Sequence, residues 1–203
     1  MTVRDGSPNR LILASGSPRR RQLLETIGLT FEVSPADIDE TEHVGESARS
    51  YVERVAADKA AAVTDHLMAT GQTGFAVLAA DTTVDLDGDI LAKPVDDADA
   101  RRMLRAMSGR THQVHTAVVG RTSTGSHATT VTTDVTFARL SDRGIEWYLS
   151  IGEHLDKAGA YGMQTAGGAL VERIDGSPTN VIGLPLAEAI GVLRACRVAV
   201  VGG

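Results

Sequence analysis

Three successive arginines follow a short apolar stretch in the segment Arg10–Leu29, RLILASGSPRRRQLLETIGL. A strand that runs into a helix at ASGSPRRR points backbone N–H groups and the positive helix end at one place, which suits a phosphate. Guanidinium groups there add paired hydrogen bonds to phosphate oxygens. Solvated first-turn positions for Arg19, Arg20 and Arg21 explain the spacing equally well. The chain contains no Gly-Lys pair, so the segment is not a P-loop.

Lysine is rare in this chain. Of 20 lysines and arginines, only three are lysines: Lys59, Lys93 and Lys157. Lysine supplies a compact point charge that arginine does not, so its use at a few positions indicates a specific need. Lys59 lies within an apolar helical stripe that runs from Tyr51 to Val63. Its ammonium must either reach solvent along its own stem or face a ligand, and periodicity alone favours the first.

Carboxylates follow two of the predicted strands. Asp81 comes directly after the apolar run Phe75–Ala80, and Asp39 and Glu40 follow an earlier strand. Side chains at the carboxyl ends of strands face the crevice in which α/β proteins bind ligands. A carboxylate there can hold a hard cation or take a proton from water. Capping of ordinary turns is an equally good explanation of these residues.

Hydrophobic periodicity predicts both strands and helices. The predicted strands are Arg10–Ser15, Phe31–Ser34, Phe75–Ala80, Thr111–Thr122, Ala128–Leu140 and a segment ending at Ile174. The predicted helices are Pro18–Ile27, a long one from Ser47, one from Asp96 or Asp97 to near Gly109, one capped by Ser141, and Pro185–Cys196. An Asp87-Gly88 pair predicts a tight hairpin. Because hairpins interrupt the alternation of helices and strands, we expect an α/β fold with a mixed sheet.

Composition narrows the classes of function. The 203 residues carry a formal net charge of −6 and only 3% aromatics, which argues against a nucleic-acid partner. No apolar run is long enough to span a bilayer and no secretion signal is present, so neither a membrane nor export is expected. Cys196 is the single cysteine, which excludes an intramolecular disulfide. Together these features predict a cytoplasmic protein.

Several other patterns carry less weight. The run Asp85–Asp89 is similar to a calcium loop, but its glycine is misplaced, which favours a hairpin. His112 and His115 are three apart on a predicted strand and therefore point to opposite faces, which is wrong for a metal pair. The glycines of Tyr161–Gly168 fit close approach by a ligand or an ordinary tight connection. No segment of the chain has the sequence pattern of a hydrolytic triad.

Eight short motifs occur in one order along nearly the whole chain. They are LASGSPRRRQLL, DIDE, AADKA, AADTTV, AKP, MLRAMSGRTHQVHTAV, LDKAGAYGMQ and VIGLPL. In this order they resemble the Maf family of nucleoside triphosphate pyrophosphatases. All three lysines fall within these motifs.

The resemblance implies a mixed twisted sheet with helices, arranged as two lobes around a central cleft in one domain, 1–203, and related to the inosine-triphosphate pyrophosphatases. Members of the family cleave a nucleoside triphosphate between its α and β phosphates, giving a monophosphate and pyrophosphate with a divalent cation, Mg²⁺ or Mn²⁺. The family also suggests a homodimer. The alternative is a nucleotide-binding regulator of cell division or septum formation without significant turnover.

The resemblance also assigns roles to residues that match its motifs. Ser15, Arg19 and Arg20 are expected to contact the nucleotide. Asp81 is the expected proton acceptor that activates water, and it also matches a contact to the cation. Glu40 matches the family's acidic partner and is expected at the metal or phosphate site.

The remaining matches concern phosphate charge and base selectivity. Lys59 and Lys93 match lysines that neutralise the phosphates, which overrides the solvent-reaching interpretation of Lys59. Arg19, Thr82 and Gln164 match the specificity positions of the subgroup that acts on dTTP and UTP. An amide such as that of Gln164 can donate to a pyrimidine carbonyl and accept from the ring N–H. The resemblance therefore implies hydrolysis of dTTP, UTP or modified pyrimidine triphosphates.

Overall fold

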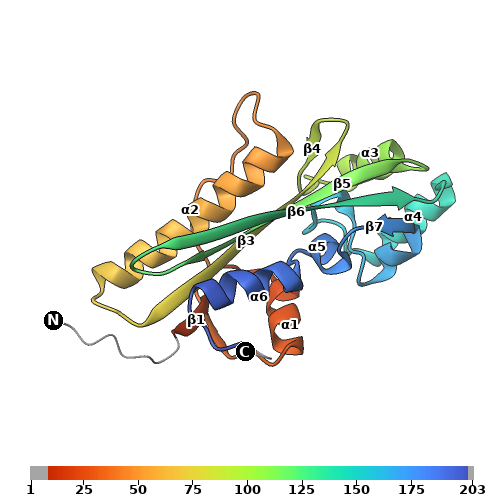
Figure 1. Cartoon of the computed structure of the whole chain (residues 1–203). Coiled ribbons are helices and arrows are strands. Elements are labelled where there is room, and N and C mark those ends of the chain that lie inside the picture. The colour runs from red at the N-terminus through yellow and green to blue at the C-terminus, as the bar shows by residue number, and fades with distance from the viewer. Residues whose placement is uncertain (1–8, 201–203) are drawn as a thin grey trace.

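The computed structural model describes residues 9–200 and contains a twisted seven-stranded sheet with helices on both faces (Figure 1). The strands are β1 (Arg10–Leu13), β2 (Phe31–Val33), β3 (Phe75–Leu86), β4 (Asp89–Leu91), β5 (Thr111–Arg121), β6 (Ser126–Phe137) and β7 (Val171–Asp175). The helices are α1 (Pro18–Thr26), α2 (Ala48–Ala69), α3 (Asp97–Met107), α4 (Asp142–Ile151), α5 (Pro178–Ile182) and α6 (Leu186–Ala195), with 3₁₀ turns η1 (Ala158–Ala160) and η2 (Ala166–Leu170). No helix within residues 9–200 is long and apolar enough to cross a membrane.

The sheet is mixed, as the sequence predicts. Its order is β2-β1-β3-β5-β6-β7, and β4 pairs with β3 outside this path. β1 is parallel to β2 and β3, because helices α1 and α2 provide the crossovers. All the other pairs are antiparallel. The hairpin turn at Asp87 and Gly88 is confirmed, and both residues have the positive φ that a tight two-residue turn requires.

The central strand β3 is longer than the sequence predicts. Periodicity ends this strand at Ala80, but the structure continues it to Leu86 because β5 pairs with it through Asp81 and beyond. Asp81 therefore lies in the middle of a strand, and the expectation that it ends one is wrong. On the other edge of β3, pairing with β1 stops at Leu78 and pairing with β4 starts at Val84. The unpaired edge between them opens the sheet beside Asp81.

Strand alternation places neighbouring residues of β3 on opposite faces. Val77 and Ala79 pack in the apolar cluster under α2, whereas Leu78 and Ala80 pack in the cluster under α1 and α6. Asp81 continues the first set and so faces α2. Thr82 continues the second set and faces α1. The open edge therefore presents Asp81 and Thr82 to one cleft from two sides of the sheet.

The core is divided along the sheet. Two apolar clusters lie on opposite faces near α2 and near α1 and α6, and a third packs β4, α3 and α4 against the far ends of β3 and β5. In Figure 1, α3 and α4 lie at one end of the sheet, whereas α1, α2 and α6 surround the other. The same long strands thus connect two lobes.

A short helix, α5, was not expected from the sequence. Its first turn is capped by the Ser177 side chain, which accepts from the Asn180 backbone N–H, and Pro178 occupies the first helical position. The helix ends at Gly183, whose φ of 123° lies in the region that favours glycine. The Ser-Pro signal is the same one that starts α1, but the five-residue length hides it from periodicity.

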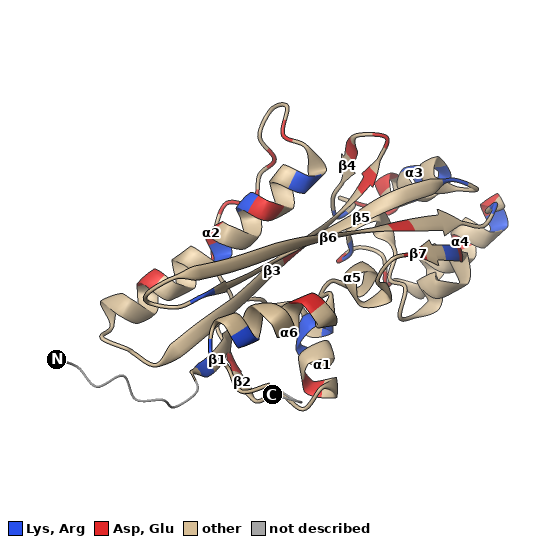
Figure 2. Ribbon diagram, in the orientation of Figure 1, with Lys and Arg blue, Asp and Glu red and all other residues tan. Residues whose placement is uncertain are grey.

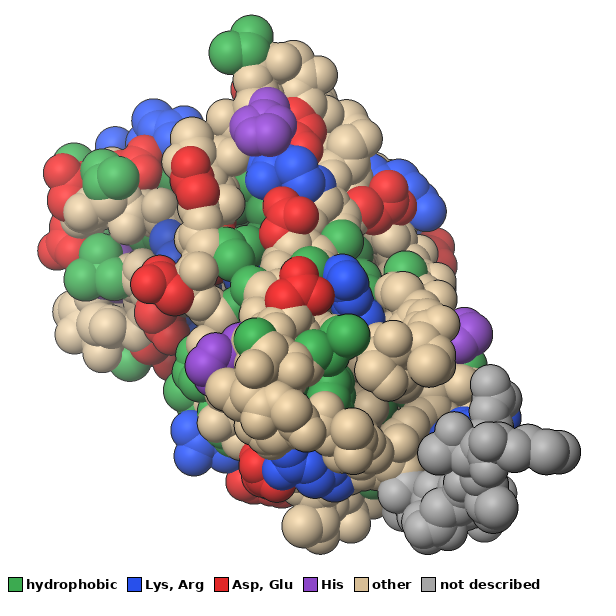
Figure 3. Space-filling view, turned by 90° about the vertical axis from the view of Figure 1, so that its left-hand side faces the viewer, with side chains coloured by type: hydrophobic (Ala, Val, Ile, Leu, Met, Phe, Trp, Pro, Cys, Tyr) green, Lys and Arg blue, Asp and Glu red, His purple; other side chains and the backbone are tan. Residues whose placement is uncertain are grey.

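Charged side chains are distributed over both lobes. In Figure 2 they lie mainly on helices and loops, and the long central strands are mostly uncharged. On the face shown in Figure 3, acidic and basic side chains are interspersed. That face does not form the broad basic surface typical of nucleic-acid binding. The absence of a nucleic-acid partner stays a prediction.

The buried His112 predicts a pH dependence of stability. It is 1% exposed, and its Nε2 lies 2.8 Å from the Tyr161 hydroxyl. Burial lowers its pKa to about 4 from an ordinary 6.5. Between these two pKa values, His112 is protonated in the unfolded chain but neutral in the folded protein. The free energy of unfolding should therefore fall by roughly 3 kcal/mol as the pH is lowered from above 6.5 to about 4.

Denaturant titrations between pH 7 and pH 4 would measure this loss. A His112→Gln variant, which cannot take up the proton, should show a shallower decline than the wild type. The lowered pKa of His115 acts in the same direction and leaves part of the slope in both proteins. Identical slopes would contradict the assignment to His112.

Candidate functional site

A cleft of about 760 Å³ lies at the open edge of β3, between the two lobes. Its walls come from the turn before α1, the loop after β2, α2, β3, the loop after β4 and the segments 156–164 and 181–183. Every residue to which the family resemblance assigns a role lines it: Ser15, Arg19, Arg20, Glu40, Lys59, Asp81, Thr82, Lys93 and Gln164. The predicted two-lobed arrangement around a cleft is confirmed.

Charge distinguishes this cleft from the rest of the chain. Five cationic side chains and three carboxylates line it: Arg19, Arg20, Lys59, Lys93, Lys157, Glu40, Asp81 and Asp156. Five minus three gives the cleft a formal charge of +2, in a chain whose net charge is −6. A cationic concavity in an acidic protein attracts and concentrates a polyanionic ligand.

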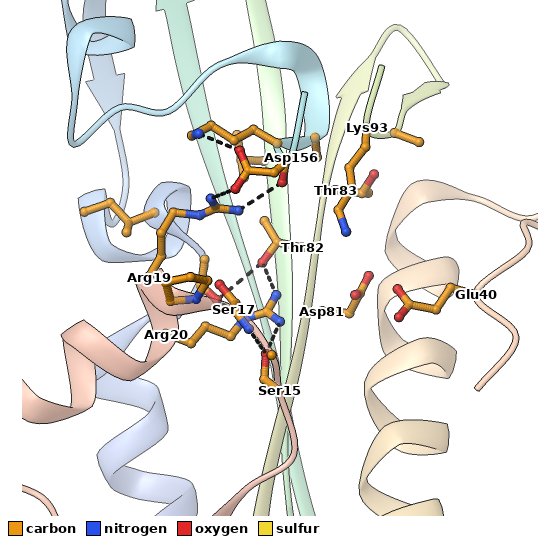
Figure 4. A pocket seen from close by; sticks show the side chains of 18 of the residues that line it. Ser15, Ser17, Arg19, Arg20, Glu40, Asp81, Thr82, Thr83, Lys93 and Asp156 are labelled. Atoms are coloured by element: carbon orange, nitrogen blue, oxygen red, sulfur yellow. Dashed lines mark hydrogen bonds and ion pairs between the residues drawn. The ribbon is translucent and has the colours of Figure 1, made fainter. Parts of the chain in front are cut away.

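A buried ion pair joins Asp81 to Lys59. The Lys59 Nζ lies 2.8 Å from Asp81 Oδ1 and 2.9 Å from Glu40 Oε2. Asp81 and Lys59 are 6% and 7% exposed, whereas the Glu40 side chain is 45% exposed. The two carboxylates lie next to each other and point toward one another in Figure 4. One ammonium therefore holds two carboxylates from different elements side by side.

The pKa of Asp81 reflects opposing effects. Burial raises it above the ordinary 3.8, and the charges of Lys59 and Arg20 act against that rise. A carboxylate that burial makes more basic and that cations keep ionised is suited to accept a proton. The same surroundings raise the pKa of Tyr51 to about 12, first through burial and then through Asp81 and Glu40.

Lys59 reaches the cleft because of its place on α2. The buried face of this helix contains Val52, Val55, Ala56, Lys59, Ala60, Val63 and Leu67, at the spacing of an amphipathic helix. The ammonium does not extend to solvent, so the solvent-reaching interpretation is wrong. It crosses the apolar face and ends at Asp81, where the open sheet edge leaves room for it.

Arg20 organises the turn before α1. It is 8% exposed, and burial lowers its pKa. Its guanidinium donates to three oxygens: Ser15 Oγ at 3.0 Å, Thr82 Oγ1 at 3.1 Å and the Gly183 carbonyl at 2.9 Å. Ser15 Oγ also accepts from the Ser17 backbone N–H. Arg20 thus holds the serine of the turn against β3 and α5.

A buried polar chain extends this network behind Thr82. Thr82 Oγ1 lies 2.9 Å from Thr116 Oγ1, and the Thr116 hydroxyl donates to the backbone carbonyl of Asn180. The Asn180 amide donates to the Val114 carbonyl and to Thr133 Oγ1. Sequence reasoning missed this chain, because the sheet and α5 bring together residues that are far apart along the polypeptide.

The first turn of α1 is open to a ligand. Ser17 is the N-cap, as predicted, but its side chain makes no capping bond, and no acidic residue lies in the first turn. The first N–H groups of a helix have no partners within the helix and carry a partial positive charge. Arg19 extends from this turn to Asp156, with Nη1 at 2.8 Å from Oδ2. Arg21 does not line the cleft.

Two further predicted residues lie at the rim. Lys93, in the loop after β4, is exposed and points toward Asp81 in Figure 4. Across residues 9–200 it makes no hydrogen bond or ion pair. Gln164 is also exposed and lines the cleft from the segment after η1, which packs in the same apolar cluster as β4. Free donors of this kind are available to a ligand.

The glycines near Gln164 are explained by packing inside the protein. A Cβ on Gly159 would meet Val84 at 2.8 Å, one on Gly162 would meet Lys157 at 2.5 Å, and one on Gly167 would meet the Gly162 backbone at 2.7 Å. The tight-connection interpretation therefore accounts for these glycines, and no approach by a ligand is needed.

The carboxylates that could hold a cation are few. Within the described part of the chain, no group of three or more His, Cys, Asp or Glu residues could hold a metal. Glu40 and Asp81 nevertheless present hard oxygen donors side by side. Mg²⁺ is commonly held by one or two carboxylates, with phosphate oxygens and water completing its shell. This donor set fits a cation that binds together with a polyphosphate.

Several proteins of similar sequence are named dTTP/UTP pyrophosphatase. A dTTP/UTP pyrophosphatase of Anaeromyxobacter dehalogenans (strain 2CP-1) is 53% identical over 189 residues, covering 91% of this chain and 93% of that protein. One of Myxococcus xanthus is 50% identical, covering 91% of each chain. One of Methylobacillus flagellatus is 48% identical, covering 98% of each chain.

A more distant likeness links the chain to a solved structure. The Staphylococcus aureus Ham1 protein aligns with 64% of this chain and 72% of its own, at 15% identity and a TM-score of 0.44. The family comparison is far stronger, since the family described as "Maf-like protein" matches residues 10–196. The chain therefore belongs to the Maf family.

Proposed function

We propose that this protein is a nucleoside triphosphate pyrophosphatase that hydrolyses dTTP, UTP or modified pyrimidine triphosphates to the monophosphate and pyrophosphate. Relatives named dTTP/UTP pyrophosphatase, about half identical over nine-tenths of the chain, support the activity. The observation that carries the proposal is the buried Asp81 carboxylate, tied to Lys59, in a cleft of net positive charge.

Asp81 is the general base in this proposal. Its carboxylate takes a proton from a water molecule, the water oxygen attacks the α-phosphorus, and the bond from that phosphorus to the bridging oxygen breaks. The electron pair of that bond leaves with pyrophosphate. Phosphoryl transfer requires positioning and charge stabilisation more than covalent chemistry, so one well-placed carboxylate suffices as the reactive group.

The cations of the cleft hold the triphosphate. Lys93, which has no partner across residues 9–200, and the uncapped first turn of α1 provide donors for phosphate oxygens. Lys59 keeps the Asp81 carboxylate ionised and in place, and its charge stabilises the negative charge that develops on the phosphates. Ser15 is held at the same turn by Arg20 and faces the same ligand.

A divalent cation, Mg²⁺ or Mn²⁺, fits Glu40 and Asp81. When bound there it would neutralise charge on the phosphate oxygens. Base selectivity is assigned to Arg19, Thr82 and Gln164. Of these, Thr82 is held by Arg20 and Thr116, whereas Gln164 is free to pair with a pyrimidine edge. A homodimer and a cytoplasmic location stay predictions from the sequence.

Turnover of a panel of triphosphates tests this function. With Mg²⁺ or Mn²⁺, release of pyrophosphate should be fastest from dTTP and UTP and slower from purine triphosphates. EDTA in excess should abolish it, and added Mn²⁺ should restore it. Binding of triphosphates without metal-stimulated release of pyrophosphate would instead support the nucleotide-binding regulator without turnover.

A further inference from the structure

Two charged residues that line the cleft have no role in the proposed chemistry. Asp156 and Lys157 lie in the segment that also carries Gln164. Asp156 accepts twice from Arg19: Nη1 lies 2.8 Å from Oδ2, and Nη2 lies 3.3 Å from the backbone carbonyl. A side chain and a main-chain oxygen therefore fix the plane of one guanidinium. The contact crosses the cleft, from α1 in one lobe to the opposite wall.

Lys157 holds Asp156 from behind. Its Nζ donates to Asp156 Oδ1 at 2.6 Å and to the Glu153 carbonyl, and the residue is 9% exposed. Its stem passes over Gly162, where an added Cβ would lie 2.5 Å from Lys157 Cε. Each oxygen of the Asp156 carboxylate thus has its own cation. Any larger residue at position 162 would displace the lysine.

The charges of this group suit a cleft for a polyanion. A lone carboxylate beside bound phosphates would repel them, but the Arg19–Asp156–Lys157 group has a net charge of +1. Burial pushes the pKa of Asp156 up, yet the hydrogen bonds from Lys157 and Arg19 outweigh burial and leave it below its ordinary value. Asp156 therefore stays ionised at neutral pH.

We propose that Asp156 and Lys157 are positioning residues that orient the Arg19 guanidinium and tie it to the segment carrying Gln164. Two residues assigned to base selectivity, Arg19 and Gln164, come from opposite lobes, and this ion-pair group joins the elements that carry them. Loss of Asp156 would leave Arg19 free to rotate on a long side chain. Selectivity among bases, more than affinity for phosphate, should then decline. This inference rests on the proposed function.

A double-mutant cycle on binding tests this role. The dissociation constants of α,β-methylene dTTP and α,β-methylene dGTP, measured by calorimetry with Mg²⁺, give a selectivity that needs no turnover. In Asp156→Ala the ratio of the two constants should shift about fivefold toward equality, as expected for one partly exposed ion pair. In an Arg19→Ala background, the same change should add nothing, because Asp156 acts through Arg19.

Asp142→Ala is the matched control. This substitution also removes a carboxylate that pairs with an arginine, here Arg105 at 2.8 Å. Because Asp142 lies outside the cleft, the selectivity of the variant should equal that of the wild type. An unchanged ratio in Asp156→Ala, or an equal shift with and without Arg19, would overturn the inference. Absence of turnover in the wild type would overturn the proposed function alone, because the binding ratio is measured on analogues that are not hydrolysed.

Discussion

Replacing Asp81 with Asn should lower kcat for dTTP by about 1,000-fold, since a positioned general base contributes roughly 10² to 10⁴. The amide keeps the shape of the side chain but cannot take the proton from water. Lys59 retains its second partner, Glu40, so the buried ammonium is not left alone. The melting temperature should therefore change by only a few degrees, and the circular dichroism spectrum should be unchanged.

The dependence of kcat on pH is an independent test of Asp81 as the general base. As the pH falls, Asp81 takes up a proton and kcat should decline. Because burial raises the pKa of Asp81, the midpoint of this decline should lie above the 3.8 of an ordinary aspartate. Asp85→Asn, four residues further along the same strand and outside the cleft, should retain near wild-type kcat. Full activity in folded Asp81→Asn would exclude Asp81 as the base.

Replacing Lys93 with Ala should lower kcat/KM by about 100-fold, because a preorganised cation that contacts transferring phosphates is worth several kcal/mol. Lys93 is exposed and makes no hydrogen bond or ion pair across residues 9–200, so its removal leaves no polar group unsatisfied. The melting temperature should stay within about 1 °C, as expected for a surface substitution. Steady-state kinetics and thermal unfolding would measure the two effects separately.

The matched control for Lys93 is Arg143→Ala, which removes an exposed cation on α4, away from the cleft. It should change neither kinetics nor stability. Lys59→Ala is a less discriminating variant, because it deprives Asp81 and Glu40 of their shared ammonium and so combines a kinetic defect with a cost in stability. Near wild-type kinetics in Lys93→Ala would exclude a contact between this residue and phosphate.

Much of the fold follows from local signals in the sequence. Pro18 at the start of α1, the Asp87-Gly88 turn and the apolar face of α2 each specify one element by its own residues. The length of β3 does not follow from such signals. Asp81, Thr82 and Thr83 interrupt the apolar run of Phe75–Ala80 that marks the strand, and they are extended because β5 pairs with them. Tertiary pairing overrides the local pattern there.

The composition of the site was predictable to the extent that its residues lie in motifs. The rarity of lysine marked Lys59 and Lys93, and the resemblance to the family supplied their place beside Asp81. Thr116 and Asn180 could not be found in this way, because their importance lies in hydrogen bonds across the sheet. Lys157 carried the same signal of rarity, but its partner, Asp156, is adjacent in sequence and looks like any exposed charge.

Phosphorus NMR of the products tests the central claim most directly. The protein would be incubated with dTTP and Mg²⁺ in the absence of other phosphatases, and the resonances followed over time. The account predicts dTMP and pyrophosphate as the only products, formed at equal rates, and formed about 1,000-fold more slowly with Asp81→Asn. Release of inorganic phosphate with dTDP, or no change of dTTP by folded, metal-loaded protein, would contradict it.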